Sequence, residues 1–144
     1  MSLVTEREGV PYLTVLSGVM LQGRDGRASL SRGDEEEARL TLYIPFTVDA
    51  RTPAGGASLY LPPREWLGAE DRADYWTLIP EGEGGGRCSF FAEGLLPAPC
   101  TLAEARRNRE NVWTVAAVSR KDYGSPALRH WEVTTRVAHY WKNG

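Results

Sequence analysis

Carboxylates are the side chains that most clearly gather in this sequence. Six of them lie in two runs, the first Asp34, Glu35, Glu36 and Glu37, and the second Glu81 and Glu83. A calcium loop alternates its oxygen ligands and includes a glycine, so an unbroken run is typical of a solvated loop whose charges repel one another. The alternative is a loop that docks onto a basic partner. We expect neither a metal nor a cofactor at these carboxylates.

Histidine and cysteine, which bind metals or take part in nucleophilic catalysis, are scarce. His130 and His139 lie nine positions apart on one expected strand, which places them on opposite faces. With Cys88 and Cys100 they do not have the spacing of a zinc site. The chain has no Gly-x-Ser-x-Gly motif, and residues 82–87 lack the lysine and hydroxyl residue of a phosphate loop. The sequence therefore predicts a protein that is not an enzyme, with two reduced thiols.

Tryptophan is frequent, and the five positions are Trp66, Trp76, Trp113, Trp131 and Trp141. Tryptophan anchors cores and protein interfaces because it brings a large contact area, and its faces also stack on sugar rings. Core packing is expected for the three that lie inside strand-like runs, Trp76, Trp113 and Trp131, more than for the two near element ends. Alternation along the last strand places Trp131 on the apolar face.

The elements that position these residues are mostly strands. Seven are expected, at residues 12–21, 39–48, 58–61, 75–79, 88–92, 112–118 and 128–141. Two short helices are expected at 63–67, which begins with proline, and at 101–107, where Thr101 and Glu104 form a capping box. The predicted fold class is mainly β, a small β-barrel or a compact β-sandwich with one or two short helices.

The length of 144 residues predicts a single domain. We divide 1–144 into an N-terminal extension at 1–11 and a β core at 12–141, with long loops at 22–38, 49–57 and 80–87. Long loops on a compact scaffold tend to carry the function.

Composition and charge exclude several classes of protein. Apolar residues are 42% and charged residues 25%, as in globular domains, so a disordered chain is excluded. The net charge of −2 argues against a nucleic-acid binder that relies on bulk electrostatics. No window holds 18 uninterrupted apolar residues, and acidic residues stand where a signal peptide is apolar. We therefore expect no membrane contact and assembly in the cytoplasm.

Five sequence runs follow one another in a recognisable order: LYIPF at 42–46, LPPREW at 61–66, YWTL at 75–78, VAAV at 115–118 and DYGSPALRHWEV at 122–133. Together they resemble a family of small minor structural proteins of tailed bacteriophages and prophages. The resemblance covers residues 12–136, and the run from Gly124 to Val133 is its most specific part. The stretch from Pro80 to Pro99 departs from the family pattern.

The resemblance implies a head–tail connector subunit of the head-closure (stopper) or tail-completion type. Such subunits form a homo-oligomeric ring between portal and tail, contact portal or adaptor and tail proteins, and belong to a virion assembled in the bacterial host cytoplasm. DNA passes through the ring, so we hypothesise that the two acidic runs face the channel or the adjacent layer, where carboxylates repel phosphate. The alternative is a monomeric phage-associated module that recognises carbohydrate or protein through exposed aromatic residues.

Overall fold

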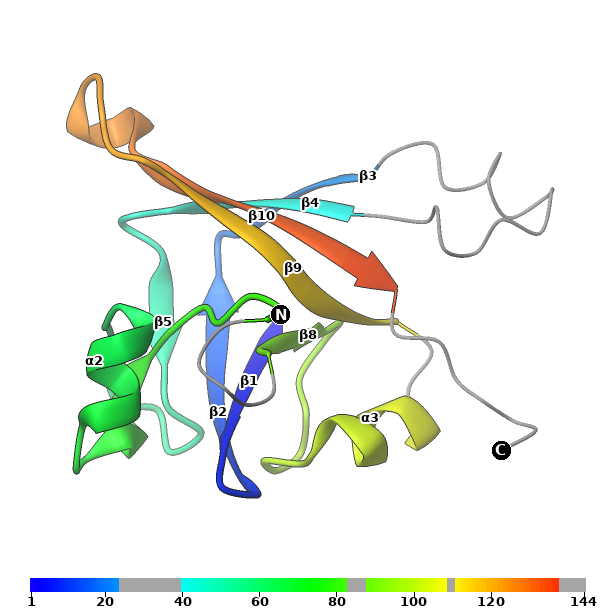
Figure 1. The fold of residues 1–144 in the computed structure, drawn as a ribbon. Helices are drawn as coiled ribbons and strands as arrows, with labels where there is room; N and C mark the ends of the chain where they lie inside the picture. The colour runs from blue at the N-terminus through cyan, green and yellow to red at the C-terminus, as the bar shows by residue number, and fades with distance from the viewer. Residues whose placement is uncertain (24–39, 83–87, 109–110, 138–144) are drawn as a thin grey trace, which may run out of the picture.

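The computed structural model describes residues 1–23, 40–82, 88–108 and 111–137. Strands dominate this part of the chain (Figure 1): β1 Ser2–Arg7, β2 Val10–Ser17, β3 Met20–Gly23, β4 Leu40–Pro45, β5 Asp49–Arg51, β6 Leu59–Tyr60, β7 Tyr75–Trp76, β8 Phe90–Ala92, β9 Val112–Lys121 and β10 His130–Val137. The helices are α2 Pro63–Gly68 and α3 Leu102–Asn108, with two 3-10 turns, η2 Arg72–Asp74 and η3 Pro126–Leu128. The predicted fold class, mainly β with short helices, is confirmed.

Eight strands form one sheet in the order β3-β4-β10-β9-β8-β1-β2-β5, and every neighbouring pair is antiparallel. The short strands β6 and β7 pair in parallel beside it. The sheet curls into a half-barrel. Leu42 of β4 and Leu16 of β2 lie near opposite ends of the strand order, and the curl brings them together in one cluster.

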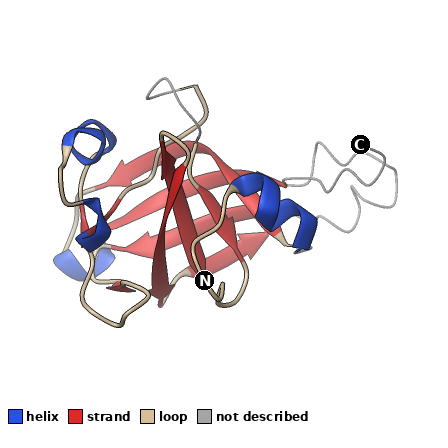
Figure 2. Cartoon of the chain, turned by 90° about the horizontal axis from the view of Figure 1, so that it is seen from below, coloured by secondary structure: helices blue, strands red, loops and turns tan. Residues whose placement is uncertain are grey.

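The two faces of the sheet support two separate apolar clusters. The inner cluster fills the curl of the sheet and consists of Leu3, Leu16, Leu42, Ile44, Ala50, Trp76, Leu78, Phe91, Val115, Trp131 and Val133. The outer cluster lies on the other face and consists of Val4, Leu13, Phe90, Ala92, Leu96, Ala105 and Val112. Helix α3 supplies Ala105 to the outer cluster, and the view in Figure 2 shows short helices around the strands of the sheet.

The prediction of an N-terminal extension at residues 1–11 is wrong. Residues 2–7 form β1, which lies between β8 and β2. Leu3 enters the inner cluster and the next residue, Val4, enters the outer one. A strand buried on both faces shows no alternation of polar and apolar residues, so periodicity did not reveal it. Glu6 is buried, and its carboxylate accepts a hydrogen bond, at 3.0 Å, from the backbone N–H of Leu102 at the start of α3. This hydrogen bond compensates the carboxylate for the loss of water.

Two other expected boundaries also differ. The single strand predicted at 12–21 is interrupted at Gly18, where φ is +94°, so the chain leaves β2 and continues as β3. Glycine adopts this left-handed conformation without steric cost, which allows the sharp change of direction at Gly18. The loop predicted at 49–57 begins with β5, whose three residues pair with β2.

Local sequence signals predicted the limits of the helices α2 and α3 well. In the capping box, the backbone N–H of Thr101 donates to the Glu104 carboxylate at 2.8 Å, and the N–H of Glu104 reaches the Thr101 hydroxyl at 3.3 Å. Strand β4 ends at Pro45, which cannot donate to the ladder.

None of the helices in the described ranges has the length and apolar character needed to span a bilayer.

Candidate interaction surface at the β9–β10 hairpin

Strands β9 and β10 form a hairpin whose closed end extends past the rest of the half-barrel (Figure 1). The connection reverses at Gly124, where φ is +84°. Ser125 is then extended, as expected before a proline, and Pro126 begins η3. The N–H of Leu128 closes this turn by donating to the Ser125 carbonyl at 2.9 Å. The sequence Gly-Ser-Pro therefore specifies the shape of the tip locally.

Large apolar side chains stand exposed on this tip. Tyr123 is 69% exposed and Leu128 is 66% exposed. Scattered exposed apolar residues are common, but these two lie in one connection, between β9 and β10, at the end of a projecting element. Tyrosine is enriched in protein interfaces because its ring gives contact area and its hydroxyl forms hydrogen bonds.

Charged side chains brace the base of the tip. Asp122 lies between two guanidinium groups, with its carboxylate 3.7 Å from Arg120 Nη2 and 3.5 Å from Arg129 Nε. His130 Nδ1 donates to the Leu128 carbonyl at 2.8 Å, and its Nε2 lies 3.5 Å from a Glu132 carboxylate oxygen. These contacts link the start and the end of the connection to each other and to the ladder.

An apolar groove of about 370 Å³ lies beside the tip. Its lining residues are Met20, Gln22, Tyr43, Pro45, Ala127, Leu128, Arg129 and His130. Turn η3 forms one wall, and the outward residues of β3 and β4 form the other. The groove makes the tip and the neighbouring strand edge one continuous surface.

Of the six acidic residues predicted as a site, one can be placed. Asp34, Glu35, Glu36, Glu37 and Glu83 lie outside the described residues. Glu81 lies at the opposite end of the hairpin from the tip, 3.3 Å from Arg136 Nε and 3.2 Å from the Thr114 hydroxyl. Its own N–H donates to the Val115 carbonyl at 3.0 Å. Glu81, at the start of the loop predicted at 80–87, is therefore paired with Arg136.

The tryptophans are distributed differently from the prediction. Trp76 and Trp131 are buried as expected, whereas Trp113 is only half-buried. Trp66, expected to be less suited to the core, is fully buried because α2 turns it inward, where its Nε1 donates to the Tyr75 carbonyl at 3.3 Å. Trp141 lies outside the described residues, as does His139.

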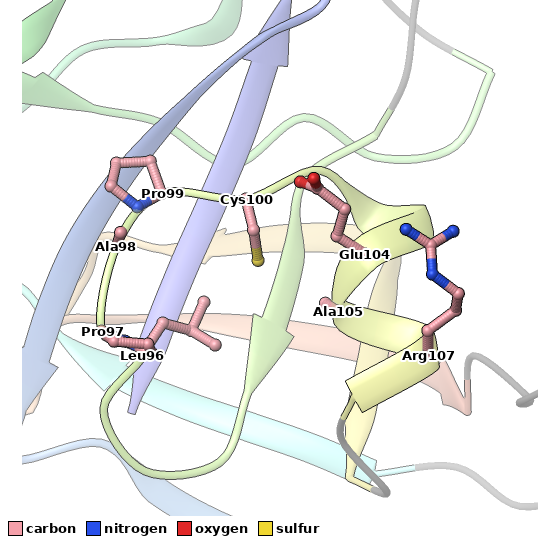
Figure 3. Close-up of a pocket in the computed structure, with 8 residues that line it drawn as sticks. All are labelled: Leu96, Pro97, Ala98, Pro99, Cys100, Glu104, Ala105 and Arg107. Atoms are coloured by element: carbon pink, nitrogen blue, oxygen red, sulfur yellow. The ribbon is translucent and has the colours of Figure 1, made fainter.

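A larger hollow, of about 600 Å³, lies over the outer cluster between residues 96–100 and α3 (Figure 3). The Cys100 thiol points into it, and neither Cys100 nor Cys88 forms a disulfide. Glu104 stands at the rim, but hydrogen bonds from Thr101 hold the pKa of its carboxyl below its usual value. Its carboxylate is thereby engaged in capping α3 and is poorly suited to accept a proton. Among the described residues, no three metal-ligating side chains gather into a cluster.

Comparison with known proteins finds no matching family model, curated protein or solved structure. The hairpin tip was not among the candidate sites that we derived from residue types. The signal that could have identified it is the run at 122–133, which carries the most specific part of the family resemblance and forms the whole tip.

Proposed function

We propose that this protein is a structural subunit of a tailed-phage particle, a head–tail connector component that contacts its neighbours through the tip of the β9–β10 hairpin. The observation that carries the proposal is a braced, projecting turn that exposes Tyr123 and Leu128. A subunit of an assembly needs a rigid core and a preformed contact element, because ordering a flexible loop on binding costs free energy.

The chemistry of the tip supports contact with another protein. Exposed apolar area at its end gains free energy when a partner covers it, at roughly 25 cal/mol per Å². The guanidinium groups of Arg120 and Arg129 form a polar border around the same turn, and both are partly accessible. Arginine pairs well with carboxylates of a neighbouring surface. An apolar centre with a charged border is the usual anatomy of a protein interface.

The connector assignment itself is supported by the family resemblance. Its most specific run coincides with the turn and the start of β10. On this proposal the partners are further copies in a ring, together with portal or adaptor and tail proteins. The protein then belongs to the virion and is assembled in the bacterial cytoplasm.

The test measures binding to portal-containing particles. The protein is analysed by light scattering alone and after mixing with those particles, and complexes are imaged. We expect ring-shaped density stacked on the portal. The double variant Tyr123→Ser with Leu128→Ser should bind at least about tenfold more weakly, because truncating interface anchors costs more than 1 kcal/mol each.

The matched control is Leu59→Ser, which changes a leucine of similar exposure, 62%, on β6. It should bind as the unchanged protein does. Failure of the unchanged protein to join the particles would overturn the connector proposal, and equal binding by the double variant would exclude the hairpin tip as the contact.

The alternative, a module that recognises carbohydrate, finds less support. It requires a row of exposed aromatic rings along a groove. Among the described residues, Tyr123 is the aromatic side chain that is exposed, while Trp66, Trp76 and Trp131 are buried. A single exposed tyrosine at a projecting tip fits a protein contact better than a sugar platform.

A further inference from the structure

The two edges of the eight-stranded sheet are protected to different degrees. At one edge, β5 is covered by the chain that follows it, because the N–H of Ser58 donates to the Ala50 carbonyl at 2.9 Å and Arg51 forms a bridge with Ala57. Asp49 and Arg51 also place an ion pair there, at 2.8 Å. At the other edge, β3 pairs with β4 on one side, and within the described residues no strand covers its second side.

Strand β3 is short, but its four residues carry none of the side chains or irregularities that discourage pairing with another chain. Natural edge strands carry charges, prolines or bulges that discourage such contacts. The four residues from Met20 to Gly23 include none of these, and their register with β4 is regular. Met20 is 64% exposed on one face and Leu21 is 46% exposed on the other. An added strand would cover both side chains and use the remaining backbone groups of β3.

We propose that two copies of this chain form a dimer by pairing their β3 strands in antiparallel orientation, which joins the two half-barrels into one continuous sheet. A second copy is the favoured occupant because an edge strand is complementary to itself about a two-fold axis. No charged side chain lies on β3, so this pairing brings no like charges together on the joined strands.

The two-fold axis fixes the register. An axis perpendicular to the sheet keeps each face continuous, so a residue must face one whose number differs from its own by an even amount. With four residues per strand, two such registers each pair three residues, one centred on Leu21 and one centred on Gln22. We choose the first because it covers the exposed leucine: Leu21 lies opposite Leu21 of the second copy, and Met20 lies opposite Gln22 of the second copy. Leu21 then buries its exposed area against an identical side chain. Met20 lines the apolar groove, and in the dimer it lies at the side of the groove that faces the second copy.

The dimer concerns the isolated protein and does not depend on the connector proposal. Its contact is centred on Leu21 at the edge of β3, and Leu21 does not line the groove that adjoins the hairpin tip, where the connector contact lies. The dimer is tested in the absence of any phage component, so the two proposals can fail separately.

The test measures the mass of the purified full chain by sedimentation equilibrium over a range of concentrations. We expect a reversible species of twice the chain mass of 16.0 kDa. The substitution Leu21→Lys places two like charges face to face on the axis and should weaken the dimer by about tenfold or more. The control Val10→Lys adds the same charge at a residue of similar exposure, 50%, on β2 and should leave the dimer unchanged.

A second variant keeps the test decisive if the lysine disturbs folding. In a background with Cys88→Ser and Cys100→Ser, Leu21→Cys should form an intermolecular disulfide under mild oxidation, because directly opposite residues have Cα atoms about 4.5–5.5 Å apart. Val10→Cys in the same background should not. A monomer at all concentrations, a dimer unaffected by Leu21→Lys, or equal crosslinking through the two cysteines would each overturn the proposal.

Discussion

At the scale of single residues, Thr77 is an unsatisfied group in the middle of the core. Its side chain is completely buried, and its hydroxyl finds no hydrogen-bond partner among the described residues. A buried hydroxyl that has lost water without gaining a partner destabilises the folded state. We expect Thr77→Val, which has almost the same shape, to raise the free energy of unfolding by about 1 kcal/mol, as measured by urea denaturation.

The matched control for this prediction is Thr135→Val. Thr135 is equally buried, but its hydroxyl donates to the Leu40 carbonyl at 2.7 Å. Removing that donor should lower the free energy of unfolding by about 1 kcal/mol or more, because the carbonyl loses its partner. If both variants lose stability, Thr77 has a partner after all.

Tyr60 predicts a dependence of stability on alkaline pH. It lies between Trp76 and Trp131, with ring centroids 5.0 and 4.6 Å away. Burial raises the pKa of its hydroxyl above 10.0, and the Arg120 guanidinium lowers that pKa in part. Above pH 10 the unfolded chain has lost this proton while the folded protein keeps it, so the free energy of unfolding falls as pH rises.

The measurement compares urea denaturation of the unchanged protein and of Tyr60→Phe at pH values on either side of 10.0. The variant should lose less stability across this range, whereas below it the two proteins should show parallel pH dependence. Tyr123→Phe, which removes the hydroxyl of an exposed tyrosine, serves as the matched comparison. Identical slopes for all three proteins would contradict the assignment to Tyr60.

At the scale of elements, β1 is the largest difference between sequence and structure, and a mild substitution tests it. Leu3 is buried in the inner cluster, so Leu3→Ala should lower the free energy of unfolding by about 2–5 kcal/mol through the cavity that remains. A residue in a solvated extension would change stability by no more than about 0.5 kcal/mol. Chemical denaturation distinguishes these outcomes, with the half-exposed Val10→Ala as the comparison.

Whether an element could be predicted depends on whether the pattern of neighbouring residues determines it. The capping box of α3 and the burial of Trp131 depend on neighbouring residues or on simple alternation, and the sequence predicted them. Strand β1 was missed because it is buried on both faces and shows no alternation, although its partner β2 follows directly in the chain. Strand β5 has three residues and pairs with β2, from which it is separated along the chain by β3 and β4, so no local pattern marks it. For the candidate site, the sequence indicated loops in general, but the exposure of Tyr123 became visible only with the hairpin in three dimensions.

At the scale of the whole molecule, the two apolar clusters share the same strands. Strand β1 sends Leu3 to the inner cluster and Val4 to the outer one, and β8 does the same with Phe91 and Phe90. Neither cluster can lose its strands without exposing the other. We therefore expect a single cooperative unfolding transition that involves both faces of the sheet, as is usual for domains of this size.

Two probes test this coupling in one protein. In a Cys88→Ser background with Trp66, Trp113 and Trp141 changed to Phe, tryptophan fluorescence reports on the inner cluster through Trp76 and Trp131. Pulse labelling of the Cys100 thiol reports on the outer cluster, against which Cys100 packs. The two transitions should share one urea midpoint, because opening the outer cluster requires β1 and β8 to separate. A rise in the rate of Cys100 labelling above its value in the folded protein, well below the fluorescence midpoint, would show that α3 and the chain around it open independently, so that the half-barrel alone is the cooperative unit.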